Sequence, residues 1–244
     1  MSSWAARYDD GEHEAVWDEI RRLGPVDAAL KDEVDEVARS TMRRAVLQLD
    51  RIAEGVTRAG WAPSSAGMAI RRRPPADASD RIAKVEAVVG PIPAALRAYL
   101  TEVGLVWLAG DVPELGLRYE DGPVSDSMPP GADYPDPLCT SDVGYLEWSL
   151  DEWLSRPEDE RPATLDFEFE PDELHKAGVS GGTHDIRLPS SVADPILSGV
   201  YGRPGITLVQ YLRVSVAWGG LPGYAFSEDE RPSLLHELRL TPNF

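Results

Sequence analysis

The chain has a single cysteine and no long apolar run. Cys139 stands alone among 244 residues, which excludes an internal disulfide and a zinc site built from several cysteines. No apolar stretch approaches the roughly 18 residues that a membrane-spanning helix requires. The first residues, MSSWAARYDDGEHE, lack the basic and then apolar pattern of a signal peptide. These absences predict a cytoplasmic protein that has no membrane segment.

Basic residues are scarce in one part of the chain. Residues 1–73 carry 13 acidic and 12 basic side chains, whereas residues 74–244 carry 29 acidic and 12 basic ones. Most of the formal net charge of −18 therefore belongs to the second segment. Such a surface repels phosphate, so we expect no direct binding of nucleic acid. It favours encounter with a basic protein, although solubility alone would also explain the charge.

Helical periodicity defines the N-terminal segment. Residues 12–24 have apolar side chains at helical spacing and end at Gly24-Pro25. A longer helix of about 28 residues is predicted within residues 32–60. Its apolar face consists of Val34, Val37, Ala38, Thr41, Ala45, Leu49, Ile52 and Val56. Together the two helices predict an N-terminal hairpin within residues 1–73. We expect its apolar face to dock on the rest of the chain, because an exposed stripe of this length would be adhesive.

Residues 74–244 show the pattern of an α+β domain, in which helices flank an antiparallel sheet. Two short helices are predicted on either side of the sequence GPIP. Ser79 or Asp80 would cap the first of them, and Gly104 would end the second. The apolar stretch LVWLAG, residues 105–110, is the first predicted strand.

Alternation predicts two further strands. In ATLDFEFE, residues 163–170, apolar side chains alternate with Asp166, Glu168 and Glu170, which are therefore expected to face solvent. The sequence THDIRLP predicts the second strand. Residues 206–218 fit either a strand or a helix; the length of the run, its terminal glycines and a cap at Thr207 favour the helix.

The segment between these two strands concentrates the side chains that carry chemistry. Asp172, His175, Lys176, His184 and Asp185 surround a Ser-Gly-Gly turn. A zinc site would require three or four converging ligands, and the chain has no HExxH or CxxC sequence. A phosphate loop would require a sequence such as GxxxxGKS or GxGxxG, which is also missing.

Catalysis by this segment has equally little support in the sequence. Ser180, His184 and Asp185 are the residue types of a catalytic triad, but no G-x-S-x-G sequence accompanies them. Cys139 has no basic neighbour that would lower its pKa, which indicates a structural thiol. The glycines suffice to explain a tight connection, with Asp172 capping a short helical turn and Lys176 near its C-terminal end. We predict no catalytic residue, no metal and no cofactor.

Several short motifs resemble those of the SUKH superfamily, which includes a fungal regulator of cell-wall synthesis and bacterial immunity proteins. The motif at the two central helices comprises Ile82, Glu86, Gly90, Ile92-Pro93, Leu96-Arg97 and Tyr99-Leu100. Ile92 replaces the commoner leucine, and the usual Asn-Gly or Gly-Gly after the second helix is reduced to Gly104-Leu105. Motifs similar to those of a long bacterial subgroup are Asp136-Pro137-Leu138, residues 175–182, residues 211–213 and residues 219–223.

The resemblance implies an α+β binding module that carries no catalytic residues. Some members of the superfamily are immunity proteins that bind and neutralise a toxin, and an acidic one would complement a basic toxin. The expected partner contacts are Glu120, Asp121, Asp126, Asp133, Asp172, His175, Lys176, His184 and Asp185. The alternative is a small hydrolase or a ligand-binding protein that uses residues 172–185. That alternative requires His175, Ser180, His184 and Asp185 to converge in a concave pocket.

Overall fold

A computed structural model of the chain describes residues 3–64, 67–115, 117, 135–177, 180–226 and 231–244. The helices are α1 (Trp4–Asp9), α2 (His13–Arg22), α3 (Lys31–Arg58), α4 (Ala78–Val89), α5 (Ala94–Ala98), α6 (Val143–Ser155), α7 (Glu173–Lys176), α8 (Leu208–Ala217) and α9 (Leu235–Leu238). Single helical turns are η1 (Ala28–Leu30), η2 (Tyr99–Val103), η3 (Pro113–Leu115) and η4 (Pro222–Ala225). The strands are β1 (Ala62–Pro63), β2 (Arg71–Arg72), β3 (Leu105–Trp107), β4 (Gly110–Asp111), β5 (Cys139–Thr140), β6 (Leu165–Pro171) and β7 (Thr183–Leu188).

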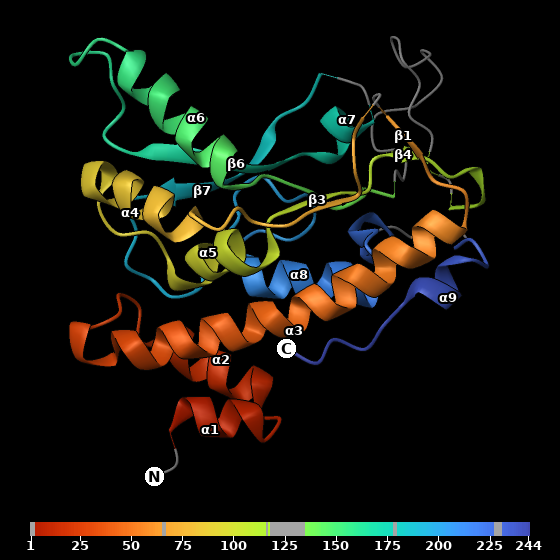
Figure 1. The fold of residues 1–244 in the computed structure, drawn as a ribbon, viewed down its shortest axis with the longest axis horizontal. Helices are drawn as coiled ribbons and strands as arrows, with labels where there is room; N and C mark the ends of the chain where they lie inside the picture. Colours follow the sequence, from red (N-terminus) through yellow and green to blue (C-terminus); the bar gives the residue numbers. More distant parts are fainter. Residues whose placement is uncertain (1–2, 65–66, 116, 118–134, 178–179, 227–230) are drawn as a thin grey trace.

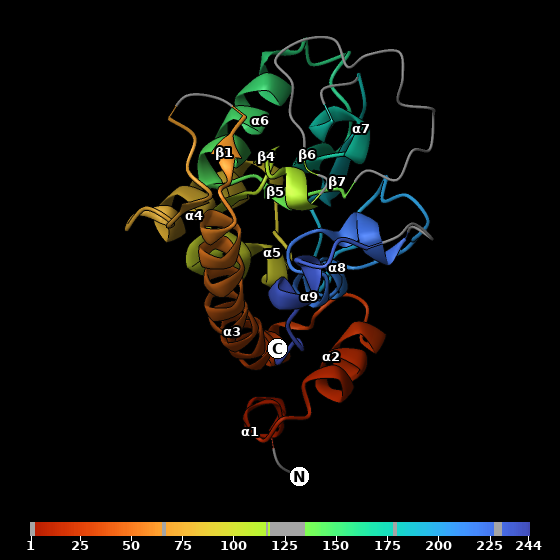
Figure 2. The ribbon, with the colours of Figure 1, turned by 90° about the vertical axis from the view of Figure 1, so that its right-hand side faces the viewer.

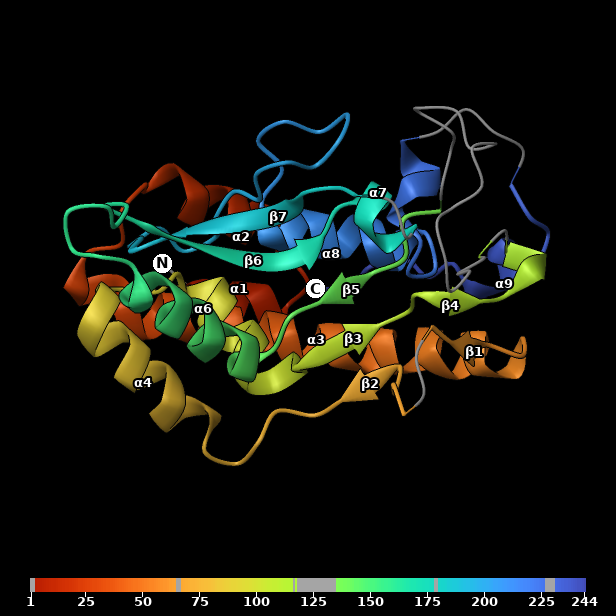
Figure 3. The same ribbon diagram turned by 90° about the horizontal axis from the view of Figure 1, so that it is seen from above.

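The predicted α+β class is confirmed, but the strands do not form one continuous sheet. Within the described residues, β1 pairs with β4, β2 with β3 and β3 with β5, and β6 with β7, always antiparallel. Most of these strands are only two or three residues long, too short to extend a common ladder. A hydrogen bond of 2.7 Å from the Ser141 N–H to the Phe169 carbonyl joins the end of β5 to β6. Figure 1 shows β6 and β7 between α6 above and α8 below, and in Figure 3, seen from above, the two strands lie over α8.

The long helix α3 lies along one side of the molecule (Figure 1). It has the predicted length of 28 residues, with Asp32 and Glu33 in its first turn and Arg58 in its last, where each charge favours the helix dipole. All eight residues of the predicted apolar face are buried, and α3 contacts α5, η2, α8 and α9. Figure 2 looks nearly along α3 and shows these shorter helices beside it. The helix therefore docks through its apolar face on the rest of the chain.

The connection after α3 takes part in the folded core. β1 and β2 precede residue 74, but they pair with β4 and β3, which follow it. In the N-terminal half of α3, the Thr41 hydroxyl accepts a hydrogen bond of 2.9 Å from the Trp17 indole N–H of α2. One cluster of buried apolar residues includes side chains from both segments of the chain, such as Val37 and Phe167.

The GPIP sequence between α4 and α5 is held by an ion pair. Arg97 pairs with Glu86, and the same guanidinium donates to the Ile92 carbonyl at 3.0 Å. The Ile92 N–H in turn donates to the Glu86 carboxylate at 3.0 Å. These contacts fix the chain direction where the prolines interrupt the helices. The predicted cap at Ser79 or Asp80 is wrong: α4 begins earlier, and Asp77 is its N-cap residue.

The ambiguous segment at residues 206–218 is a helix, as the terminal glycines and the cap favoured. Thr207 accepts a hydrogen bond from the Gln210 N–H, and the Gln210 side chain accepts one from the Thr207 N–H. This reciprocal capping box starts α8. Asp194 also accepts hydrogen bonds from the Thr207 hydroxyl at 2.7 Å and from Arg21 at 2.9 Å, so the start of α8 is tied to α2.

Candidate functional site

A β-bulge determines which acidic side chains of β6 face the core. Glu168 lies opposite Asp185, but Glu170 lies opposite His184, so two residues of β6, Phe169 and Glu170, face one residue of β7. At such a bulge, two successive side chains of one strand face a single residue of its partner, so the side chains that follow no longer alternate as they would in a regular strand. Both Phe169 and Glu170 are fully buried. The prediction that Glu170 faces solvent is therefore wrong, because alternation was counted through the bulge.

Lys176 lies among the buried carboxylates on this inner face. Its ammonium donates to the Asp136 carboxylate at 2.6 Å and to the Glu170 carboxylate at 2.5 Å. The Tyr211 hydroxyl donates a further hydrogen bond to Glu170. Together with His184, these residues form what we call the inner cluster: Asp136, Glu170, Lys176, His184 and Tyr211. It joins β6, β7, α7, α8 and the segment before β5.

The short helix α7 places Lys176 in this cluster. Asp172 caps the helix as predicted, by accepting a hydrogen bond of 2.8 Å from the His175 N–H. One residue further along, the Lys176 side chain points inward and has no solvent exposure. Lys176 and His184 were expected to contact a partner; both are buried, so neither lies on the surface where a partner would bind.

Burial and charge together set the protonation of the inner cluster. Burial alone disfavours the Lys176 ammonium, but Asp136 and Glu170 outweigh this effect and raise the pKa of Lys176 above its ordinary value. Burial raises the pKa of Asp136, and the neighbouring ammonium opposes that shift. The pKa of His184 is lowered to about 4, first by burial and then by Lys176. His184 is therefore neutral at pH 7.

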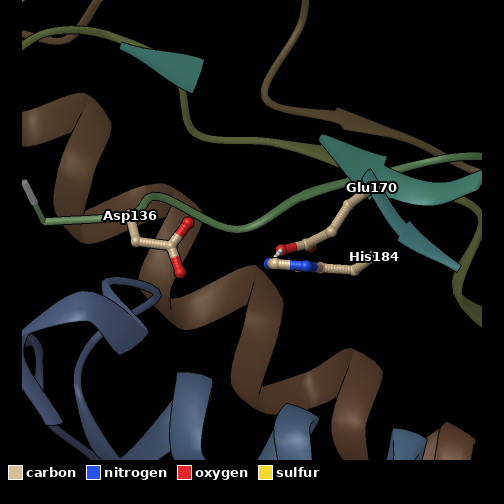
Figure 4. Close-up of side chains that lie close together, drawn as sticks. All are labelled: Asp136, Glu170 and His184. Atoms are coloured by element: carbon tan, nitrogen blue, oxygen red, sulfur yellow. Dashed lines mark ion pairs between the residues drawn. The ribbon is translucent and has the colours of Figure 1, made fainter. Parts of the chain in front are cut away.

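His184 is the least satisfied member of the inner cluster. Neither of its ring nitrogens has a hydrogen-bond partner among the residues that the structure describes, and its Nε2 lies 3.9 Å from the nearer Glu170 oxygen. The ring meets Tyr211 edge-on, with centroids 5.9 Å apart. Figure 4 shows the His184 ring beside the Glu170 carboxylate, with Asp136 across from them.

Asp136, Glu170 and His184 have the donor set of a metal site. One ligand atom from each lies within 4.8 Å of the others, and carboxylate and imidazole ligands suit zinc and related ions. However, the Lys176 ammonium already bonds both carboxylates. A metal ion here would have to displace that ammonium, so the residues present do not fit a metal as they stand. Sequence spacing gave no signal for this cluster, because Asp136 is remote from residues 170–184.

The outward face of the same hairpin carries a different set of charges. Glu168 and Asp185 lie directly opposite each other, while Asp166 pairs with Arg187 at 3.2 Å. The Tyr145 hydroxyl of α6 donates to Glu168. One oxygen of Asp185, Oδ1, is buried and has no hydrogen-bond partner within the described part of the chain. Burial raises the pKa of Asp185; a hydrogen bond with the Thr183 side chain opposes this shift, and the nearby Glu168 and Asp166 add to it.

Two depressions meet at α6. The smaller, which we call the outer hollow, has a volume of about 310 Å³. Its lining includes Trp148, Glu152, Trp153, Asp166, Glu168 and Asp185. A wider groove of about 790 Å³ runs from α6 across β3 and β6, and its lining includes Arg72, Arg81, Trp107, Tyr145, Trp148 and His175. In that groove, Arg72 pairs with Asp142, and Arg81 with Glu147.

The residues of the hydrolase alternative do not converge. His184 points into the core, whereas the neighbouring Asp185 points to the opposite face, as strand alternation requires. Ser180 is exposed, and His175 lines the wider groove away from the buried imidazole. Cys139 is buried, and burial raises its thiol pKa to about 12, which makes it a poor nucleophile at neutral pH.

The other expected contact residues divide into two groups. Asp172 caps α7, and His175 and Asp185 line the depressions described above. Glu120, Asp121, Asp126 and Asp133 lie outside the described residues.

Three of the motifs that carry the resemblance meet in the inner cluster. Asp136, Lys176 and Tyr211 come from the DPL, HKA and YLR sequences respectively. The fourth motif, residues 219–223, adjoins them, because the Leu138 N–H donates to the Gly220 carbonyl at 2.9 Å.

Comparison with protein-family models, with curated proteins and with solved structures finds no match. No helix within the described part of the chain is long and apolar enough to cross a membrane.

Proposed function

We propose that this chain is a cytoplasmic protein-binding module of the immunity type, which captures and neutralises a basic toxin. The observation that carries the proposal is the charge of the outward face beside α6. Four carboxylates and one guanidinium line the outer hollow, and two of the carboxylates lie directly opposite each other. A basic partner would supply the charge that this face lacks.

The arrangement of the remaining charges supports the same proposal. Arg72, Arg81 and Arg97 form ion pairs with acidic side chains of the chain itself. Lys176 neutralises buried carboxylates and is not exposed. Residues 74–244 still retain 17 more acidic than basic side chains. The resulting field would accelerate encounter with a basic protein and discourage binding of acidic ones.

Neutralisation would then be steric. An immunity protein of this kind binds the toxin tightly enough to cover its functional surface, and it needs no chemistry of its own. The separation of His184 from Asp185 and the burial of Cys139 agree with a binding role. No observation favours the hydrolase alternative over it.

The test pairs a growth assay with binding kinetics. A basic protein encoded beside this chain would be expressed in a sensitive host with and without the chain, and growth would be measured. The purified pair would then be followed by surface plasmon resonance at low and high salt. We expect protection, and an association rate constant that falls steeply with salt while the dissociation rate constant changes little. Failure to protect, together with failure to bind, would reject the proposal.

A further inference from the structure

We propose that the outer hollow receives an arginine side chain of the partner protein. This inference rests on the proposed function and names the group by which a basic partner would be recognised. The hollow is lined by α6 on one side and by the outward residues of β6 and β7 on the other. At about 310 Å³ it lies at the small end of ligand pockets, which suits one side chain better than a whole segment.

The first reason is a like-charge pair that forms no ion pair with a cation of the described residues, although the Arg156 guanidinium also lines the hollow. Glu168 and Asp185 are directly opposite each other on antiparallel strands, an arrangement that destabilises a sheet. The next pair along the same face, Asp166 and Arg187, has opposite charges. The Tyr145 hydroxyl satisfies one Glu168 oxygen but brings no positive charge.

The second reason is an acceptor that lacks a donor. The Asp185 Oδ1 atom is buried and has no hydrogen-bond partner among the described residues, although the carboxylate also interacts with the Thr183 side chain. Leaving a buried acceptor unsatisfied is unfavourable, and more so for a charged group. An arriving guanidinium would supply N–H donors at this point, and its fork would reach the opposing carboxylate as well.

The third reason is the aromatic wall. The Trp148 side chain is 50% exposed, and its ring packs against Tyr145, with centroids 4.9 Å apart. Trp153 lies on the same helix, and Arg161, which follows that helix, lies 4.9 Å from the centre of its ring. Among the described residues, no cation is placed over Trp148 in this way. The indole of Trp148 therefore offers an unoccupied face on which a planar guanidinium would stack.

A metal ion fits the outer hollow less well than a guanidinium. Within the described residues, the group of three ligand atoms lying within 4.8 Å of one another is Asp136, Glu170 and His184, on the inner face. The outward carboxylates are more widely spaced and do not form such a group. A lysine ammonium would satisfy the charge, but it is a point charge and lacks the flat surface that stacks on an indole.

The experiment uses the full chain and a blocked Gly-Arg-Gly peptide. The indole N–H resonance of Trp148 is assigned with the Trp148→Phe variant and followed by NMR during a titration. The matched control peptide carries citrulline, which keeps the shape of arginine and removes its charge. We expect a saturable shift with the arginine peptide, with a Kd on the order of 1 mM. Citrulline should bind about tenfold more weakly, because the charge-assisted hydrogen bonds are lost.

Two protein variants locate the binding. Asp185→Asn should weaken arginine binding by about tenfold, the effect of losing a hydrogen bond to a charged group. Asp151→Asn is the control, because Asp151 is exposed on the same helix but does not line the hollow. Equal shifts from both peptides would overturn the inference. So would equal losses in both variants, or the lack of a saturable shift at roughly 50 mM peptide, far above the expected Kd.

The outcome is separable from that of the proposed function. If a basic protein binds the chain and Asp185→Asn leaves its affinity unchanged, the arginine site is rejected and the proposed function stands. If the arginine peptide binds as expected and no basic protein is bound or neutralised, the outer hollow is an arginine site and the proposed function is rejected.

Discussion

The two faces of the β6–β7 hairpin treat their carboxylates in opposite ways. On the inner face, Glu170 shares the Lys176 ammonium with Asp136 and also accepts a hydrogen bond from Tyr211. On the outer face, Glu168 faces Asp185 across the strands, and within the described part of the chain neither forms an ion pair with a cation. The chain thus supplies a positive charge where burial makes an unpaired carboxylate most costly, and leaves the pair near solvent without one.

This contrast separates charges that hold the fold from charges available for binding. The inner cluster is buried, so its ammonium is needed for stability and is inaccessible to a partner. The outer carboxylates impose a modest cost that water partly screens, and a partner would relieve that cost. Changes on the inner face should therefore alter unfolding strongly, whereas changes on the outer face should alter recognition.

The strongest test of the contrast is Lys176→Met. The variant leaves two buried carboxylates without their counter-ion, and we expect a loss of about 3–5 kcal/mol in the free energy of unfolding, measured with urea at pH 7. The control is Lys84→Met, because Lys84 is exposed on α4; its effect should stay within about 0.5 kcal/mol. Adding Glu170→Gln to Lys176→Met should restore part of the stability. Equal effects of the two lysine variants would show that the inner ion pairs do not stabilise the fold.

The second test uses the pH dependence of His184. The folded pKa of about 4 lies below the ordinary value of 6.5, so between these values the unfolded imidazole binds a proton that the folded one does not. Stability attributed to this group is complete above pH 6.5 and falls as the pH is lowered toward 4, by about 3 kcal/mol. His184→Phe should remove this component. Urea unfolding at several pH values would compare the His184→Phe variant with the parent and with the control His175→Gln. If the stability of the parent and of His184→Phe changed with pH in the same way, the pH dependence could not be attributed to His184.

The third test removes the hydrogen bond from Tyr211 to Glu170. Tyr211→Phe keeps the buried ring and deletes only the hydroxyl, so we expect a loss of about 1.5–3 kcal/mol, the range for hydrogen bonds to charged groups. Tyr201→Phe is the control, since Tyr201 is 71% exposed. Thermal and urea unfolding measure both variants. A Tyr211→Phe protein as stable as the parent would mean that the hydrogen bond from Tyr211 to Glu170 does not stabilise the fold.

The smallest expected effect has the opposite sign and belongs to the outer face. Asp185→Asn removes one charge of the cross-strand pair, so we expect a gain of about 0.5 kcal/mol in the free energy of unfolding. Asp166→Asn should give no gain, because Asp166 already has Arg187 as its partner. Urea unfolding at low salt gives the clearest difference, since salt screens the repulsion. A less stable Asp185→Asn protein would reveal that Asp185 already has a stabilising partner within the chain.

Local sequence patterns predicted the helices better than the sites. The apolar spacing of α3, the Thr207 cap of α8 and the Asp172 cap of α7 depend on residues within a few positions of one another, and all three predictions are confirmed. The inner cluster joins Asp136 to residues 34 to 75 positions later in the chain, and no local pattern encodes those distances. Alternation also failed at Glu170, because a bulge has no distinctive residue type in this strand.

The outer hollow shows the same limit in another form. Glu168 and Asp185 were each visible as acidic residues in predicted strands. Their opposition depends on the register of β6 against β7, which the bulge and the connection between the strands determine together. Trp148 is placed beside them by the packing of α6 on β6, a tertiary contact. The residue types were therefore evident from the sequence, and their juxtaposition was not.

Because β6 contains one extra residue, the β6–β7 hairpin should be more sensitive to the insertion or deletion of a residue than to most substitutions. Deleting a single residue between Glu168 and Glu170 would leave the composition nearly unchanged and would restore strict two-residue alternation. Glu170 would still lie opposite His184 on the inner side, because Glu168 keeps its place opposite Asp185, but the buried Phe169 ring would be lost from the core. Among related sequences, insertions and deletions in residues 165–171 should consequently be rarer than replacements, and those that persist should come in compensating pairs across the two strands.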